Sequence, residues 1–228
     1  RLKALAKAYA VVPAKDYGTA LKDAEVVILA VKPQNLPQLM PELKSRLVPG
    51  QLVLSIVAGA DIATIVAGLG HNSVVRAMPN TPGQIGEGVT VWTASHRASH
   101  SHKEMARSIL GALGREIYVR DEKYIDMATA VSGSGPAYIF LVMEALIDAG
   151  VHIGLPREMA GELVLQTLLG SGRLAQETGR SPAELRNMVT SPGGTTAEGL
   201  LQLEEGGLRA LLAHAVIAAY EKAKILGG

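Results

Sequence analysis

Hydrophobic residues in the first half of the chain alternate between a pattern typical of buried strands and one typical of helices. Residues 25–31 (EVVILAV) and 52–57 (LVLSIV) are almost continuous apolar runs, which predict strands buried on both faces. A helix is predicted between them, over about 35–47, by apolar residues at helical spacing: Leu36, Leu39, Met40, Leu43 and Leu47. A second helix is predicted from its N-cap Asp61 to Leu69, and further strands over 73–78, 89–93 and 116–119.

Strands that alternate with helices through short links predict a parallel sheet covered by helices on both faces. Ligands bind such sheets at the carboxyl ends of the strands. Three of these ends read Val31-Lys32-Pro33, Val57-Ala58-Gly59 and Met78-Pro79-Asn80-Thr81, so we expect binding residues there, Asn80 included. Lys32 either meets a cofactor phosphate or is a solvated residue at a strand end, and the sequence favours neither.

After residue 120 the strand pattern stops and only helices are predicted. They cover about 122–131, 136–149, a stretch from Pro156, 182–189, a stretch after Gly194, and 208–226. We therefore expect two domains, residues 1–120 and 121–228. Several of these helices are apolar around most of their circumference, so a second copy of the chain is the expected cover.

Composition and charge exclude several classes of protein. The chain has no cysteine, which excludes a disulfide framework, zinc-finger spacing and a thiol nucleophile. No apolar run reaches the ~18 residues of a membrane span, so a soluble intracellular protein is expected. Residues 1–120 hold 14 Lys and Arg against 8 Asp and Glu, which suits an anionic ligand. No basic stripe with interleaved aromatics is present, so nucleic-acid binding is not expected.

The segment 191–198 (SPGGTTAE) is the strongest candidate for chemistry. Thr195 and Glu198 form a T-x-x-E pattern, which predicts a capping box at the start of a helix. The two preceding glycines let backbone N–H groups converge, and a helix start attracts anions. With the hydroxyls of Ser191, Thr195 and Thr196, this is a candidate pocket for a small carboxylate or phosphate. The local pattern alone nevertheless favours an ordinary capped connection between helices.

Two other groups of residues look like ligand sites but are not predicted to be ones. Gly133-Ser134-Gly135 follows no strand and precedes Pro136, so we interpret it as a helix break and a tight packing point. His96, His100 and His102 lie in a Ser- and Arg-rich segment without a nearby carboxylate, and no metal site is expected. The phosphate-binding pattern G-x-G-x-x-G is absent, and the chain begins inside a helical pattern, so we expect a preceding segment to be missing.

Four motifs in chain order resemble the successive signatures of the pyrroline-5-carboxylate reductase family. They are residues 30–34 (AVKPQ), 76–82 (RAMPNTP), 132–138 (SGSGPAY) and 191–196 (SPGGTT), and residues 148–151 (DAGV) and 154–157 (GLPR) fit the same family. The resemblance covers essentially the whole chain. It implies an α/β fold in which a Rossmann-type parallel sheet, truncated here, is followed by an all-helical dimerisation domain. Family members form interlocked homodimers, which often assemble into larger rings.

The resemblance also implies an activity and a set of site residues. The family reduces 1-pyrroline-5-carboxylate to L-proline by hydride transfer from NADPH or NADH, which implies a cytoplasmic enzyme of proline biosynthesis. The resemblance places Val31, Lys32, Pro33, Val57 and Ala58 beside the nicotinamide ribose and brings Glu122 near the cofactor. Gly194, Thr195 and Thr196 match the loop that holds the substrate carboxylate, with Ser191 in support. The Thr196 hydroxyl matches one that reaches the ring nitrogen and is our candidate catalytic group.

Two departures from the family weaken the expected cofactor binding. The first strand, the glycine-rich turn and the second strand of the family have no counterpart in these residues, so this chain by itself is expected to be nearly inactive. Tyr17 stands where the family usually has Asn. Two alternatives stay open: a related two-domain dehydrogenase of another imino or hydroxy acid, and a non-catalytic chain that acts only as a dimerising helical module.

Overall fold

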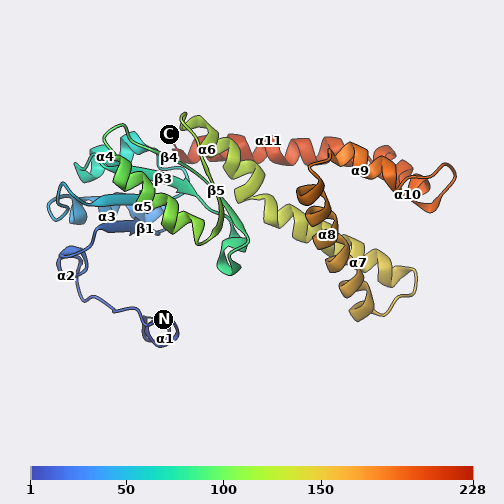
Figure 1. Ribbon diagram of the computed structural model, residues 1–228, viewed down its shortest axis with the longest axis horizontal. Helices are drawn as coiled ribbons and strands as arrows, with labels where there is room; N and C mark the ends of the chain where they lie inside the picture. The colour runs from blue at the N-terminus through green and yellow to red at the C-terminus, as the bar shows by residue number, and fades with distance from the viewer. Residues whose placement is uncertain (1, 228) are drawn as a thin grey trace. The chain divides into compact units, whose positions relative to one another are not determined.

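The computed structural model describes residues 2–227, which form two compact units (Figure 1). The sheet unit holds the residues up to Ser134 and those from Ala219 onward, and the helical unit is Gly135–Ala218. This division differs from the expected boundary at residue 120. It does so because α6 (Lys123–Ala128) packs against the sheet and because the end of the last helix belongs to the sheet unit.

Five strands form one sheet in the order of the chain: β1 (Val26–Leu29), β2 (Leu52–Ser55), β3 (Val74–Met78), β4 (Gly88–Ala94) and β5 (Gly114–Tyr118). The first three are parallel and in register, with Leu29 beside Ser55 and Ser55 beside Arg76. Their carboxyl ends therefore share one edge, as the sequence predicts.

The sheet is mixed rather than wholly parallel, which corrects the expectation. β4 runs antiparallel to β3, and β5 runs parallel to β4. Only residues 79–87 link β3 to β4, and a parallel crossover needs about a dozen residues or more. This link instead makes a 3₁₀ turn, η2 (Thr81–Ile85), and the chain reverses.

Helices bury both faces of the sheet, which explains the continuous apolar runs. On one face α2 (Tyr17–Leu21), α3 (Leu36–Lys44) and α4 (Ile62–Leu69) enclose a core that includes Leu43, Val53, Ile65 and Val74. On the other face α5 (His100–Gly111) covers Leu54, Val75 and Trp92. Asp61 caps α4 as predicted, its carboxylate accepting the Thr64 N–H at 2.7 Å. The remaining helix of this part of the chain is α1 (Leu2–Tyr9).

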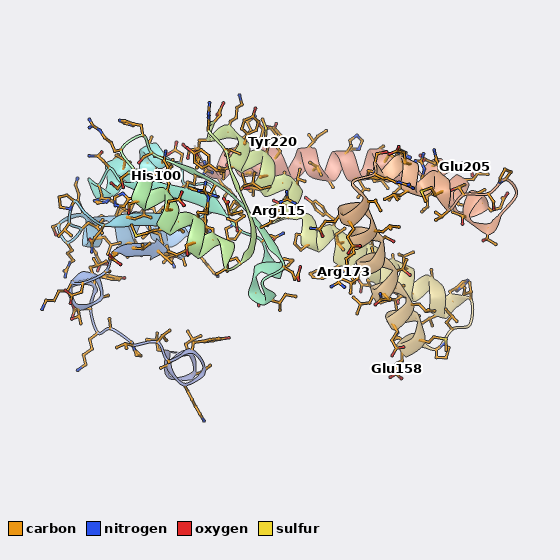
Figure 2. The ribbon with its side chains drawn as sticks, viewed as in Figure 1. His100, Arg115, Glu158, Arg173, Glu205 and Tyr220 are labelled. Carbon is orange, nitrogen blue, oxygen red and sulfur yellow. The ribbon has the colours of Figure 1, made fainter. Side chains whose placement is uncertain are left out.

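The helical unit contains α7 (Gly135–His152), α8 (Arg157–Thr178), α9 (Pro182–Met188), α10 (Thr195–Glu205) and the first part of α11 (Leu208–Gly227). α7 and α8 pack against each other as a helical hairpin (Figure 1). Side chains project from several sides of α8, Glu158 and Arg173 among them (Figure 2). Large apolar side chains are also exposed, including Phe140 at 60% and Leu211 at 62%.

One helical stretch is longer and more apolar than the sequence analysis expected. Lys123–His152, which joins α6, the π-helical turn η3 (Thr129–Gly133) and α7, is long and apolar enough to cross a membrane by length and composition alone. The same property is expected of a helix whose apolar surface a second chain covers. Its part from Gly135 onward therefore adds to the exposed apolar surface of the helical unit.

Candidate active site

The first group of predicted site residues lies at the shared carboxyl edge of β1, β2 and β3. Lys32 follows β1, is exposed, and immediately precedes the 3₁₀ turn η1 (Pro33–Asn35). No carboxylate pairs with its ammonium group within the described residues. Val31 lines an open groove of 320 Å³ along β1, and Tyr17 lines the same groove. The departure at Tyr17 thus lies close to the predicted cofactor residues.

Residues 56–61, which we call the cofactor loop, connect β2 to α4 at the same edge. Val57 is buried and its N–H donates to the Ser55 hydroxyl at 3.2 Å, whereas Ala58 is partly exposed. Gly59 has a φ of +78°, and a Cβ there would overlap the carbonyl oxygen of Leu226, in the last turn of α11. Glycine is therefore required by both the backbone angle and the close approach of α11.

Asn80 stands at the end of β3 and has a structural contact of its own. Its side-chain oxygen accepts the Val89 N–H at 2.9 Å and so holds the turn between β3 and β4. In the Asn80 side chain, the NH₂ group is then what is left to donate a hydrogen bond to a ligand. Gly133 also reaches this edge, because a Cβ at residue 133 would stand 3.2 Å from Met78 Cε. Gly133 is thus a tight packing point, as the sequence predicts, but the predicted helix break is wrong, because the π-helical turn η3 leads through Ser134 into α7.

Glu122 reaches the cofactor loop from the start of α6. Its Oε1 accepts the backbone N–H of Ile62, the first residue of α4, at 2.8 Å. The same oxygen accepts a hydrogen bond from Arg76 Nη1 at 3.0 Å. The other terminal nitrogen of Arg76, Nη2, donates to Asp126 Oδ1 at 2.6 Å. Sequence reasoning assigned no role to Arg76 or Asp126. The available signal was a charged residue inside the apolar run of β3.

The second group of predicted residues lies at the start of α10, in the helical unit. Ser191 O accepts the Gly194 N–H at 3.1 Å, and Gly193 has a φ of +68°. A Cβ on Gly194 would stand 2.5 Å from the Ser191 hydroxyl oxygen, so glycine lets this turn close. The turn brings Ser191 beside the helix start that carries Thr195 and Thr196.

The predicted capping box at Thr195 is wrong. The N-cap of α10 is Gly194, which has extended backbone angles, and no side chain caps the helix. Thr195 and Thr196 are the first two helical residues, and both are exposed. The N–H groups of residues 197 and 198 bond back to Gly194 O at 3.0 and 3.3 Å. The N–H groups of Thr195 and Thr196 have no acceptor inside the helix, so both can bind an anion.

The histidines of the α5 region lack a metal-binding arrangement. Among residues 2–227, no three His, Cys, Asp or Glu side chains gather where they could hold a metal ion. His102 is engaged instead with the Gly50 carbonyl, at 3.2 Å from its Nε2. His100 lies at the start of α5 (Figure 2).

Comparison with known proteins identifies the family. The pyrroline-5-carboxylate reductase of Arabidopsis thaliana is 42% identical over 206 residues, which are 90% of this chain and 74% of that protein. The chain belongs to the pyrroline-5-carboxylate reductase family. The family description "Pyrroline-5-carboxylate reductase dimerisation" matches residues 122–226, and "NADP oxidoreductase coenzyme F420-dependent" matches residues 1–59.

Two solved structures of pyrroline-5-carboxylate reductases share the fold across the chain. The Coxiella burnetii structure is 41% identical and has a TM-score of 0.90. The match covers 100% of this chain and 85% of that protein. The Plasmodium falciparum structure was solved with NADP bound. It is 34% identical with a TM-score of 0.89, and the match covers 94% of this chain and 82% of that protein. The α/β fold class and the resemblance that the sequence motifs predicted are therefore confirmed.

Proposed function

We propose that the protein reduces 1-pyrroline-5-carboxylate to L-proline, with NADPH or NADH as the hydride donor. The observation that carries this proposal is the start of α10, where two N–H groups without a capping side chain lie beside the hydroxyls of the SPGGTT segment. This arrangement suits a small carboxylate, and it occurs in a chain of the pyrroline-5-carboxylate reductase family.

The carboxyl edge of the sheet fits a nicotinamide dinucleotide. Lys32 supplies an exposed cation, and the cofactor loop supplies backbone groups at a tight turn. We assign cofactor contacts to Val31, Lys32, Pro33, Val57, Ala58 and Asn80. Glu122 has one carboxylate oxygen engaged with Ile62 and Arg76, which leaves Oε2 for a cofactor hydroxyl. The NADP bound to the Plasmodium falciparum relative supports the choice of cofactor.

The start of α10 would hold the substrate at both of its polar ends. The N–H groups of Thr195 and Thr196 bind the carboxylate, with Gly194 giving room and Ser191 supporting the turn. The Thr196 hydroxyl accepts the N–H of the protonated imine and so fixes the ring. Hydride transfer further requires the reduced nicotinamide to stand next to the imine carbon of the bound ring.

The chemistry needs orientation more than acid–base catalysis. When bound, the reduced nicotinamide supplies a hydride to the imine carbon. The C=N electron pair then becomes the nitrogen lone pair, and because the iminium form already carries its proton, no strong base is needed. The contribution of the chain is to hold the ring at a fixed distance and angle, which accounts for a large part of such rate enhancements.

We also propose a homodimer formed through the helical unit, located in the cytoplasm, where reduced nicotinamide cofactors are available. The exposed apolar side chains of α7, α8 and α11 support the dimer, because a lone chain would leave them in water. The match to a dimerisation family over residues 122–226 supports the same surface. A ring of dimers, as is common in this family, is the larger assembly we propose.

A steady-state assay with synthetic 1-pyrroline-5-carboxylate tests the function. We expect NADPH or NADH to be oxidised in equal amount to the L-proline formed, and the ratio of kcat/KM values decides between the two cofactors. Parallel assays with other cyclic imino acids and with 2-hydroxy acids provide the control. The assay uses the full-length enzyme; faster turnover of one of those substrates, or a folded full-length dimer with no turnover at all, would contradict the proposal.

A further inference from the structure

The most unusual polar group of the sheet unit is the buried guanidinium of Arg76. Arg76 lies in β3 and is 3% exposed. A charged group is retained in such a place only when partners compensate its lost hydration. Two carboxylates compensate the lost hydration of Arg76. Glu122 accepts from Nη1 of the guanidinium at 3.0 Å, and Asp126 accepts from Nη2 at 2.6 Å.

The two carboxylates have different connections beyond Arg76. Glu122 Oε1 also accepts the Ile62 N–H at 2.8 Å, whereas among residues 2–227 no hydrogen bond joins the Asp126 side chain to the cofactor loop. Ile62 is the first residue of α4, and its N–H has no acceptor inside the helix. Glu122 therefore joins the central strand to the end of the cofactor loop, and Arg76 fixes the orientation of the carboxylate that makes this link.

The cofactor loop is also restrained from a second direction. The last turn of α11 lies so close to Gly59 that a Cβ at residue 59 would stand 2.8 Å from Leu226 Cβ. The loop is thus held between α11 and the Glu122 carboxylate. Val57 and Ala58 immediately precede Gly59, so the backbone that carries them runs directly into a segment restrained at both Gly59 and Ile62.

We propose that Arg76 is a positioning residue for the cofactor: through Glu122 it sets where the cofactor loop stands at the carboxyl edge of the sheet. This inference rests on the proposed function, because it requires a nicotinamide cofactor at that edge. Arg76 itself is buried and bonds Glu122, so it needs no contact with the cofactor or the substrate to act in this way.

The primary test is Arg76→Lys in the intact enzyme, with Asp126→Asn as the matched control. Lysine keeps the charge but presents one compact ammonium group, which cannot bond both carboxylates in the fork geometry. We expect the KM for NADPH to rise about tenfold, because a misplaced positioning group of this kind costs that much or more. We expect the KM for 1-pyrroline-5-carboxylate to stay within about twofold. Asp126→Asn removes the negative charge from the other half of the cluster and should leave both KM values within about twofold.

Hydrogen exchange of the Ile62 amide, measured without cofactor, supplies a readout independent of activity. It should quicken in Arg76→Lys and stay unchanged in Asp126→Asn. If Arg76→Lys does not fold, Arg76→Gln replaces it, because that variant also breaks the paired bonds to both carboxylates and leaves the Glu122 side chain in place.

Two results would overturn the inference: an unchanged KM for NADPH in the variants that free the Ile62 amide, or an equal rise in Asp126→Asn. A failure of the proposed function looks different. It would appear as a wild-type enzyme that does not turn over 1-pyrroline-5-carboxylate, before any variant is made.

Discussion

The variant Thr196→Ala removes one hydroxyl group from the first turn of α10 and leaves the backbone donors of that turn in place. Thr196 is an exposed second residue of the helix and makes no cap, so alanine is tolerated there. The proposed bond joins the hydroxyl to a charged iminium N–H. Hydrogen bonds to charged groups contribute about 1.5–3 kcal/mol. Since about 1.4 kcal/mol corresponds to a factor of ten, kcat/KM should fall roughly 10- to 150-fold.

Steady-state kinetics, read from the loss of NADPH absorbance, measures this change, and NADPH affinity and the dimer should stay as in the wild type. Thr195→Ala is the control for stability. Because Gly194 is the N-cap, this variant should change the free energy of unfolding by less than about 0.5 kcal/mol, against ~1 kcal/mol for a lost cap. If Thr196→Ala keeps more than about half of the wild-type kcat/KM, the role we assign to its hydroxyl is wrong.

Three further predictions concern the dimer, the cofactor loop and acid stability. Phe140→Glu should shift the protein from dimer towards monomer in light scattering at low micromolar concentration, whereas a wild-type monomer there would refute the proposed interface. Gly59→Ala should lower the melting temperature, since its left-handed backbone alone costs roughly 1–2 kcal/mol, while Gly50→Ala, whose Cβ meets open space, should not. The hydroxyl and backbone N–H of Ser181 donate to Glu184 and hold the pKa of that carboxyl below its ordinary value of 4.5. The stability that Glu184 contributes is therefore complete above pH 4.5 and lost as the pH falls through the lowered pKa, so urea unfolding should show Glu184→Gln converging on the wild type in acid; a constant difference would contradict this.

The sequence predicted the elements well because each carries a local pattern. The apolar run of β2 and the spacing of Leu36, Met40 and Leu43 each identify an element without reference to the rest of the chain. Asp61 was likewise recognisable as a cap. The antiparallel β4 was also within reach, because a link of residues 79–87 without a helix cannot make a parallel crossover.

The errors arose where two local arrangements fit the same residues or where partners are far apart in the chain. At the start of α10 both Gly194 and Thr195 could cap, and only the extended angles of Gly194 decide between them. Arg76 lies 46 residues before Glu122, and a single sequence contains no signal that pairs them. The roles assigned to Thr196 and to the cofactor residues remain predictions until the variants are measured.

The path of α11 limits how the two units can be exchanged between proteins. The chain leaves the sheet unit after Ser134 and returns to it at Ala219, where Ala223 is 6% exposed. The helical unit is therefore an insertion within the sheet unit, rather than a module appended to its end. A chimera that contains the sheet unit must therefore also include the end of α11 from Ala219 onward, for instance by circular permutation. Without this end of α11, Gly59 would lose its contact with Leu226 and would be exposed to water.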